Sequence, residues 1–175
     1  MAVTVVATVG SATANSYDEV ANITTYIEGR LNSSAWDSAS GDTQNRAAVE
    51  ATRTLELMPW RGTRVDATQA LAWPREYVPI RDPSTASASS YYSSTAIPTD
   101  IKEALAELAL EFVKAGTTDL GVAATGSNLK RKKIDVLEWE YSAAQVEGLQ
   151  KFTRVMVKID HYLEPTAYSN EVVRV

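Results

Sequence analysis

The sequence predicts a mainly α fold: a small helical bundle with a minor β element, a long extended loop and an extended C-terminal tail. Apolar residues recur at helical spacing in four segments, residues 17–31, 48–58, 101–113 and 149–163. β-branched residues gather at 3–9, and apolar and charged residues alternate within 134–141. The loop over 59–97 exceeds the roughly 12 to 15 residues that connections in compact domains rarely pass.

We expect one domain over residues 1–175, with a core at about 15–58 and 98–163. A projecting arm then covers 59–97, and a C-terminal tail covers 164–175. The hydrophobic fraction of 45% is normal for a folded chain. The net charge of -5 argues against a protein whose main work is wrapping nucleic acid, because such binding neutralises phosphates with Lys and Arg.

The residue types present leave little room for catalysis. The chain has no cysteine and a single histidine, His161, which excludes a disulfide framework, a thiolate metal site and a multi-histidine site. His161 lies near a helix end and is expected to be structural. Glu103, Glu107 and Glu111 are spaced by four residues, which is typical of a solvated helix face. We therefore expect no enzyme activity and no cofactor or metal.

The first part of the chain predicts a strand followed by a helix. Residues 3–9 read as a strand whose expected partner is 134–141, with a bulge at Val136–Leu137. Ser16 and Glu19 form a capping-box pattern, which predicts that a helix starts there and runs to about Arg30.

Three further helices are predicted before and after the long loop. A short turn carries Trp36, and a second long helix follows Ser40 and ends at Pro59. The helix that starts at Thr99 is the most hydrophobic and is expected at the centre of the bundle, ending at Gly116. A last helix is predicted up to Leu163, with Pro165 closing it.

The long loop divides into an aromatic first half and a serine-rich stretch over 84–90, so it is predicted to be an arm that reaches a neighbouring molecule. Rings at the base of such a loop can also pin it to its own domain, and both interpretations stay open for Trp60 and Trp73. Tyr91 and Tyr92 are better interface candidates. The candidate arm residues are Trp60, Trp73, Arg75, Tyr77, Tyr91 and Tyr92.

A basic run precedes the alternating segment and consists of Lys130, Arg131, Lys132 and Lys133. Next to Trp139 and Tyr141 it could form a platform for single-stranded DNA, where charges follow the backbone and rings stack on bases. A solvated strand edge, or docking onto an acidic partner, is the alternative.

An ordered series of motifs carries a family resemblance. Its members are Tyr17 with a helix to Leu31, Ala35-Trp36-Asp37, Ala51-Thr52-Arg53, Pro59-Trp60-Arg61-Gly62, Gln69-Ala70-Leu71-Ala72-Trp73-Pro74-Arg75, and Ile97 to Ala104 with Glu107-Leu108-Ala109. Together they resemble the head-to-tail connector (adaptor, or head-completion) proteins of tailed bacteriophages, including relatives labelled DnaT-like single-stranded-DNA-binding proteins. The resemblance covers about residues 15–142. The chain departs from short family members in an insertion at 81–95 and in a longer last helix and tail.

The resemblance implies a structural virion protein at the head-tail junction, made in the cytoplasm of a bacterial host. About twelve copies would form a ring between the portal and the next tail-completion or stopper protein. DNA would pass through the central channel without sequence-specific binding. The arm would serve the ring and lower interfaces, and the tail would contact the portal through Tyr168, Val172, Val173, Arg174 and Val175. The alternative function is a single-stranded-DNA-binding accessory protein.

Two expectations concern localisation. No Lys or Arg precedes Arg30, so the apolar start of the chain lacks the basic region of a signal peptide. No apolar run approaches about 20 residues, so no membrane span is expected.

Overall fold

A computed structural model describes residues 2–81, 90–116, 130–134, 137–141 and 152–164. The helices are α1 (Val20–Glu28), α2 (Ser34–Asp37), α3 (Gly41–Glu56), α4 (Thr99–Ala115), α5 (Thr153–Ile159) and the 3-10 helix η3 (Asp160–Tyr162). The strands are β1 (Thr63–Arg64), β2 (Arg75–Glu76), β3 (Lys130–Ile134) and β4 (Leu137–Tyr141). The predicted class, mainly α with a minor β element, is confirmed.

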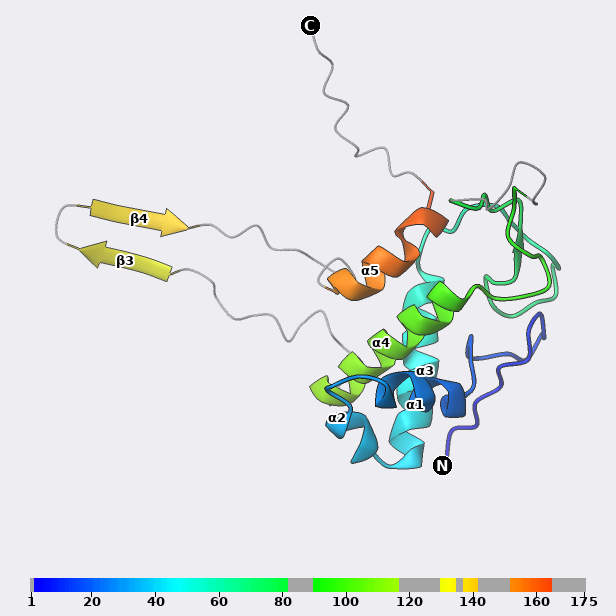
Figure 1. Cartoon of the computed structure of the whole chain (residues 1–175), viewed down its shortest axis with the longest axis horizontal. Coiled ribbons are helices and arrows are strands. Elements are labelled where there is room, and N and C mark those ends of the chain that lie inside the picture. The colour runs from blue at the N-terminus through cyan, green and yellow to red at the C-terminus, as the bar shows by residue number, and fades with distance from the viewer. Residues whose placement is uncertain (1, 82–89, 117–129, 135–136, 142–151, 165–175) are drawn as a thin grey trace, which may run out of the picture.

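Helix α4 forms the centre of the bundle, as its apolar content predicts. It packs against α1, α2, α3 and α5 (Figure 1). Ile101, Leu105 and Leu108 are fully buried along it. Helix α4 packs most extensively against α3. Ala48 and Ala51 of α3 are buried, and such small side chains let two helices approach closely. Gly116 ends α4 in the left-handed conformation, as expected for a C-terminal glycine.

The helix starts differ in part from the predictions. Helix α3 follows Ser40 as predicted, and Ser40 caps it, since its side chain accepts a hydrogen bond from the Thr43 N–H. Helix α1, however, begins only at Val20, and the Ser16 hydroxyl instead donates to the carbonyl oxygen of Asp18. The Asp18 carboxylate accepts from the Glu19 N–H and the Asn22 amide. The Ser16 hydroxyl therefore bonds within a local turn and does not cap the helix, contrary to what the capping-box pattern predicted.

The predicted strand over residues 3–9 is wrong. Within the described residues its backbone bonds to side chains and to the turn that follows and not to another strand: the Val6 carbonyl oxygen, for example, accepts from the Asn15 and Ser16 N–H groups. The Val3 N–H donates to Asp42, the Val6 N–H donates to the side chain of Asn15, and the Asn45 amide donates to the Val3 carbonyl oxygen. These contacts tie the N-terminal segment to the start of α3.

Residues 134 and 137–141, in the predicted partner of the segment 3–9, instead belong to a separate two-stranded ribbon. Strands β3 and β4 pair antiparallel with each other, with Ile134 opposite Leu137. The predicted single strand with a bulge at Val136–Leu137 is therefore corrected. The change of face seen in the sequence falls between the end of β3 and the start of β4, and the basic run forms part of the ladder.

The acidic face predicted on α4 is not uniformly solvated. Glu107 is 5% exposed and accepts a hydrogen bond from the Tyr26 hydroxyl at 2.9 Å. It also forms an ion pair with Arg30, so two groups near the end of α1 compensate its charge. Glu103 and Glu111 pair with Lys158 and Lys114. Helical spacing alone cannot separate a solvated carboxylate from one that joins two helices.

The segment predicted as a projecting arm folds onto the bundle. Within its described part, the side chains of Trp60, Leu71, Trp73, Val78 and Ile97 are buried in the core. Strands β1 and β2 pair antiparallel, and Pro79 bridges to Tyr91. Buried apolar area holds the loop in place, so residues 59–81 and 90–97 form part of the domain.

Several predictions fall outside the described residues. These are the serine-rich tip within 82–89, the loop 117–129, the start of the last helix at Leu149, and the tail with Tyr168, Val172, Val173, Arg174 and Val175. Within the part that is described, the helices are too short or too polar to cross a membrane.

Replacing Gly62 with alanine is expected to destabilise the fold more than replacing Gly10 with alanine. Both glycines have φ of +73°, so each substitution carries the left-handed cost of about 1 to 2 kcal/mol. A Cβ at Gly62 would also lie 2.1 Å from the carbonyl oxygen of Glu76, whereas one at Gly10 would meet nothing within 4 Å. Urea denaturation of both variants measures the difference, and equal losses would contradict the close packing of the loop.

Candidate functional site

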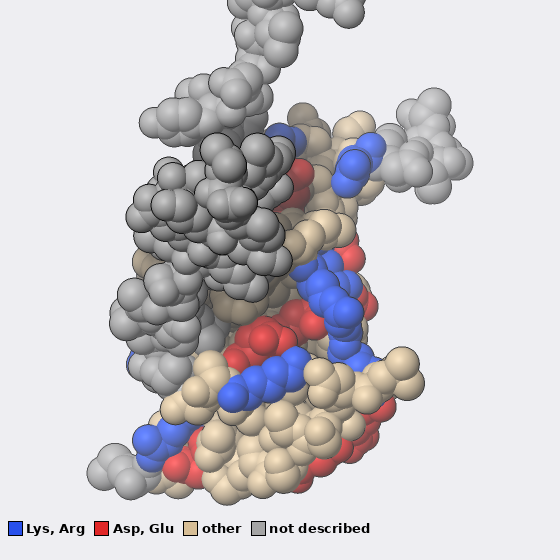
Figure 2. Space-filling model, turned by 90° about the vertical axis from the view of Figure 1, so that its left-hand side faces the viewer, with Lys and Arg blue, Asp and Glu red and all other residues tan. Residues whose placement is uncertain are grey.

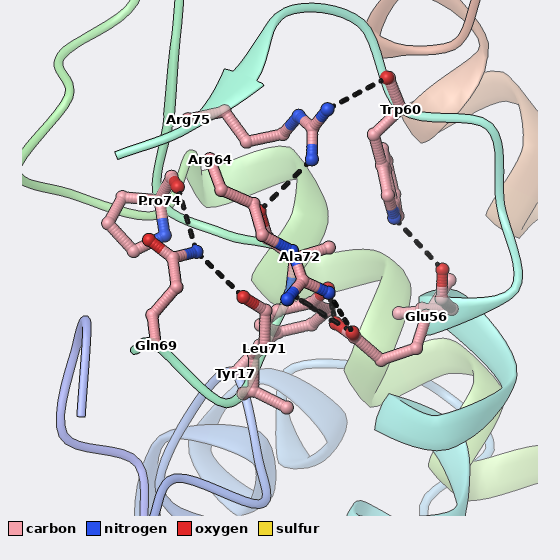
Figure 3. A network of polar contacts seen from close by, with 10 residues as sticks. Tyr17, Glu56, Trp60, Arg64, Gln69, Leu71, Ala72, Pro74 and Arg75 are labelled. Carbon is pink, nitrogen blue, oxygen red and sulfur yellow. Dashed lines mark hydrogen bonds and ion pairs between the residues drawn. The ribbon is translucent and has the colours of Figure 1, made fainter. Parts of the chain in front are cut away.

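The long loop is the candidate functional site, and Arg75 organises its base. The guanidinium donates to the carbonyl oxygens of Arg61 at 2.7 Å and Gly62 at 2.5 Å. It also donates to the Trp60 carbonyl oxygen at 3.2 Å (Figure 3). It also reaches the Ala72 carbonyl oxygen at 3.3 Å. Burial lowers the pKa of Arg75, and the nearby Arg64 acts in the same direction. The rigid fork of five N–H donors suits this clustering of carbonyl groups, which fixes the two ends of the β1–β2 turn.

Glu56, at the end of α3, holds the middle of the loop. Both of its carboxylate oxygens accept from the Ala72 N–H, at 2.8 and 3.0 Å, and Oε1 also accepts from the Tyr17 hydroxyl. Burial raises the pKa of Tyr17 well above its ordinary value, and the charge of Glu56 raises it further. Figure 3 shows the Glu56 side chain extending from α3 to these groups. One carboxylate thus joins α3, the segment before α1 and the loop.

The side chain of Gln69 supports the same turn. Its amide donates to the carbonyl oxygens of Leu71 at 2.7 Å and Pro74 at 3.1 Å, and its oxygen accepts from the Asp66 N–H. The Trp73–Pro74 peptide bond is cis. The motif from Gln69 to Arg75, the most specific part of the family resemblance, is therefore a folding motif whose polar ends bond the backbone of the loop itself.

Edge-to-face contacts between aromatic rings connect the loop to η3. Trp73 meets Trp60 edge to face at 5.9 Å between ring centroids, and it meets Tyr162 of η3 at 5.6 Å. The Trp60 indole donates to the Leu55 carbonyl oxygen at 3.1 Å. Such contacts add to the large apolar area that each ring removes from water.

The structure sorts the predicted arm residues into two groups. Trp60 and Trp73 are 6% and 1% exposed, so of the two interpretations left open for them the structure favours rings that pin the loop to its own domain. Arg75 bonds to carbonyl groups of its own loop but is only half-buried, and its place at an inter-subunit surface stays a prediction. Tyr92 is half-buried and packs on Tyr162 at 4.9 Å between centroids. Tyr77 and Tyr91 remain on the surface.

Tyr77 and Tyr91 form an exposed aromatic pair, with 65% and 48% of their surfaces accessible. Their rings meet edge to face at 6.1 Å. Tyr77 has φ of +61°, a left-handed backbone conformation that bulky residues rarely adopt. The fold therefore holds a large ring at the surface in a conformation that costs free energy. Backbone outliers of this kind occur often at functional surfaces.

The basic run lies apart from this loop in the sequence and forms strand β3. The register of the ribbon places Lys130 opposite Tyr141 and Lys132 opposite Trp139. Arg131 and Lys133 are opposite Glu140 and Glu138. Residues directly opposite share a face, and the side-chain period of a strand is two. One face of the ladder thus combines two lysine positions with two aromatic positions, and the other alternates basic and acidic positions.

The described residues contain no group of three or more His, Asp or Glu that could hold a metal ion. Glu56 carries no distinguishing pattern in the sequence, because it resembles any surface acid near a helix end. Asp100 likewise resembles an ordinary acid in the first turn of a helix. In the structure it accepts from the Tyr162 hydroxyl at 3.1 Å and lies 3.8 Å from His161.

The surroundings of His161 favour its neutral form. Burial lowers its pKa, and Arg81 and Arg61 act in the same direction against Asp100 and Asp160. Its Nε2 lies 3.3 Å from the Tyr92 hydroxyl. His161 is thus a structural residue beneath the loop, which agrees with the expectation from its position.

His161 predicts a pH dependence of stability. The unfolded chain takes up this proton at about pH 6.5, before the folded chain does, so the free energy of unfolding falls as the pH drops from about 7 to about 5. His161→Gln is expected to show a smaller fall, because it removes this group and leaves the carboxylates unchanged. Chemical denaturation at several pH values measures both profiles, and parallel profiles would contradict the assignment.

Comparison with known proteins gives one match. Residues 1–175 match the family described as "Putative DnaT-like ssDNA binding protein". Neither the search of curated proteins nor the search of solved structures found a match. Because the family match spans the whole sequence, the chain belongs to this DnaT-like family.

Proposed function

We propose that the chain is a head-to-tail connector adaptor, a structural virion protein at the head-tail junction. Copies of it would form a ring between the portal and the next tail-completion or stopper protein, with a central channel for DNA. The observation that carries this proposal is the Tyr77–Tyr91 pair, presented on a loop whose own anchors are satisfied internally. The family match supports it as well, since the connector relatives include chains with the DnaT-like label.

The backbone conformation of Tyr77 gives an energetic reason for the aromatic pair to contact another molecule. A left-handed conformation costs about 1 to 2 kcal/mol for a residue with a Cβ. Tyr77 recovers little of this inside its own chain, because 65% of its surface stays in water. Contact with another molecule would bury the ring, and tyrosine is enriched among the residues that dominate interfaces. The pair is thus suited to contact a neighbouring subunit or the next ring.

The distribution of charge is compatible with a channel through which DNA slides. Lys and Arg side chains lie next to Asp and Glu side chains on the face shown in Figure 2. Lys102 forms an ion pair with Asp18, and Lys158 forms one with Glu103. Together with the net charge of -5, this arrangement would neutralise few phosphates, so DNA would not be held.

A variant at Tyr77 tests the assembly role separately from folding. Tyr77→Asn removes the aromatic side chain and places at φ +61° a residue that tolerates this conformation, so the subunit should keep or gain stability. Assembly of the subunits into an oligomeric ring should nevertheless weaken strongly. Tyr77→Phe keeps the aromatic side chain and is the matched control.

Electron microscopy and native mass measurement of the purified chain report the rings, and urea denaturation reports the fold. Rings of about twelve subunits from wild type and Tyr77→Phe, with smaller species from Tyr77→Asn, are the expected result. Rings that form equally well from Tyr77→Asn would remove the pair from the interface. A wild-type chain that stays monomeric and is absent from virions would end the connector proposal.

A second candidate function, binding of single-stranded DNA, is favoured by the description of the family and by the ribbon. The ladder places Lys130 and Lys132 opposite Tyr141 and Trp139, the combination of charge and rings that single strands require. If Lys132 contacts a phosphate, Lys132→Gln should reduce the slope of log K against log salt concentration for oligonucleotide binding by about 1. Arg53→Gln, at an exposed position of α3, is the control and should leave the salt dependence unchanged. Fluorescence anisotropy at several salt concentrations measures this, and no binding at low salt would exclude the role.

A further inference from the structure

A cleft separate from the aromatic pair lies where the end of the long loop meets α4 and η3. Its volume is about 380 Å³, and its walls include Tyr92, Ile97, Pro98, Asp100 and Tyr162. The volume falls within the usual range of ligand pockets, and apolar walls with few polar groups are typical of them. Neither the proposed function nor the family description assigns this cleft.

Asp100 supplies the only full charge among the side chains that line the cleft in the described part of the chain. Its side chain is 47% exposed. Although it lies in the first turn of α4, no side chain caps the start of this helix. Its Oδ2 instead accepts from the Tyr162 hydroxyl, and within the described residues no donor reaches Oδ1. A carboxylate can accept several hydrogen bonds, so capacity remains on the side of the cleft.

The positive charges nearby do not neutralise Asp100. His161 is its ion-pair neighbour at 3.8 Å, but burial keeps this ring neutral near pH 7. Arg61 donates to the Leu163 carbonyl oxygen at 2.5 Å. Arg81 acts on His161, but among the described residues it is not within ion-pair distance of Asp100. The carboxylate therefore presents its charge to an incoming group.

One partly exposed tyrosine ring stands beside this carboxylate. Tyr92 is half-buried, whereas Tyr162 is 1% exposed and supports it from below, with 4.9 Å between the two ring centroids. A planar cation can stack on an aromatic ring, and a guanidinium donates two parallel hydrogen bonds to a carboxylate. An ammonium group would use the charge and not this planar wall. The combination of the Tyr92 ring and the Asp100 carboxylate is therefore complementary to an arginine side chain.

We propose that this cleft binds the guanidinium group of an arginine side chain presented by a partner protein. This binding does not depend on the Tyr77–Tyr91 surface. The cleft proposal can fail while the connector role holds, and the connector role can fail while the cleft still binds arginine. The positive end of the α4 dipole favours anions and reduces the demand for a cation, which makes an anionic occupant the main rival.

Titration of the isotope-labelled full chain with N-acetyl-arginine amide tests this proposal by NMR. Amide resonances of Ser93, Thr99 and Asp100 should shift at millimolar concentration, as expected for a single side chain. The neutral analogue N-acetyl-citrulline amide has nearly the same shape and should produce no such shifts. Equal shifts from both compounds, or shifts with inorganic phosphate and none with the arginine compound, would overturn the proposal.

Two variants locate the site. Asp100→Asn keeps an acceptor for Tyr162 but removes the charge, and it should weaken binding by about tenfold or more. Asp42→Asn changes the equivalent first-turn acid of α3, far from the lining residues, and should leave binding unchanged. Resonances outside the cleft show whether each variant is folded. Undiminished binding by folded Asp100→Asn would refute the assignment.

Discussion

The fold depends on the satisfaction of backbone groups in a loop that has little regular secondary structure of its own. A loop of this length that lies against a core must find partners for its carbonyl and N–H groups, or pay for burying them. Arg75 collects carbonyl groups at the base, Glu56 accepts from the Ala72 N–H, and Gln69 bridges the turn between them. Without these three side chains the tryptophans could not be buried where they are.

This organisation explains what the sequence could and could not reveal. Helical periodicity located α3 and α4, because each buries a continuous apolar stripe that the pattern records directly. The loop was misjudged as a projecting arm, since its buried contacts are spread over rings and polar side chains with no period. The strand predicted at 3–9 failed for a related reason. β-branched residues favour extended backbone, but only the tertiary contacts with Asn15 and Asp42 decide what pairs with it.

The candidate surfaces were predictable to different degrees. Of Tyr91 and Tyr92, which the sequence favoured as interface residues, Tyr91 is exposed whereas Tyr92 is half-buried on Tyr162. The strained backbone of the exposed Tyr77 can be seen only in the structure. The cleft at Asp100 gave no sequence signal, because residues from the loop, α4 and η3 meet there from distant positions. Internal anchoring of the loop suits the proposed contact of the exposed rings with a neighbour, because a surface that is already ordered loses less conformational freedom on binding.

The contacts between the loop and the end of α5 also constrain how the chain can fold. Arg61 donates to the carbonyl oxygen of Leu163 across 102 residues, and the Glu164 N–H donates back to the Pro59 carbonyl oxygen. Contacts of such sequence separation form late and slow the search for the native state. During synthesis the loop therefore cannot reach its final packing until residues near 164 have left the ribosome. The base of the loop at residues 59–61 thus closes last, after α5 and η3 have been made.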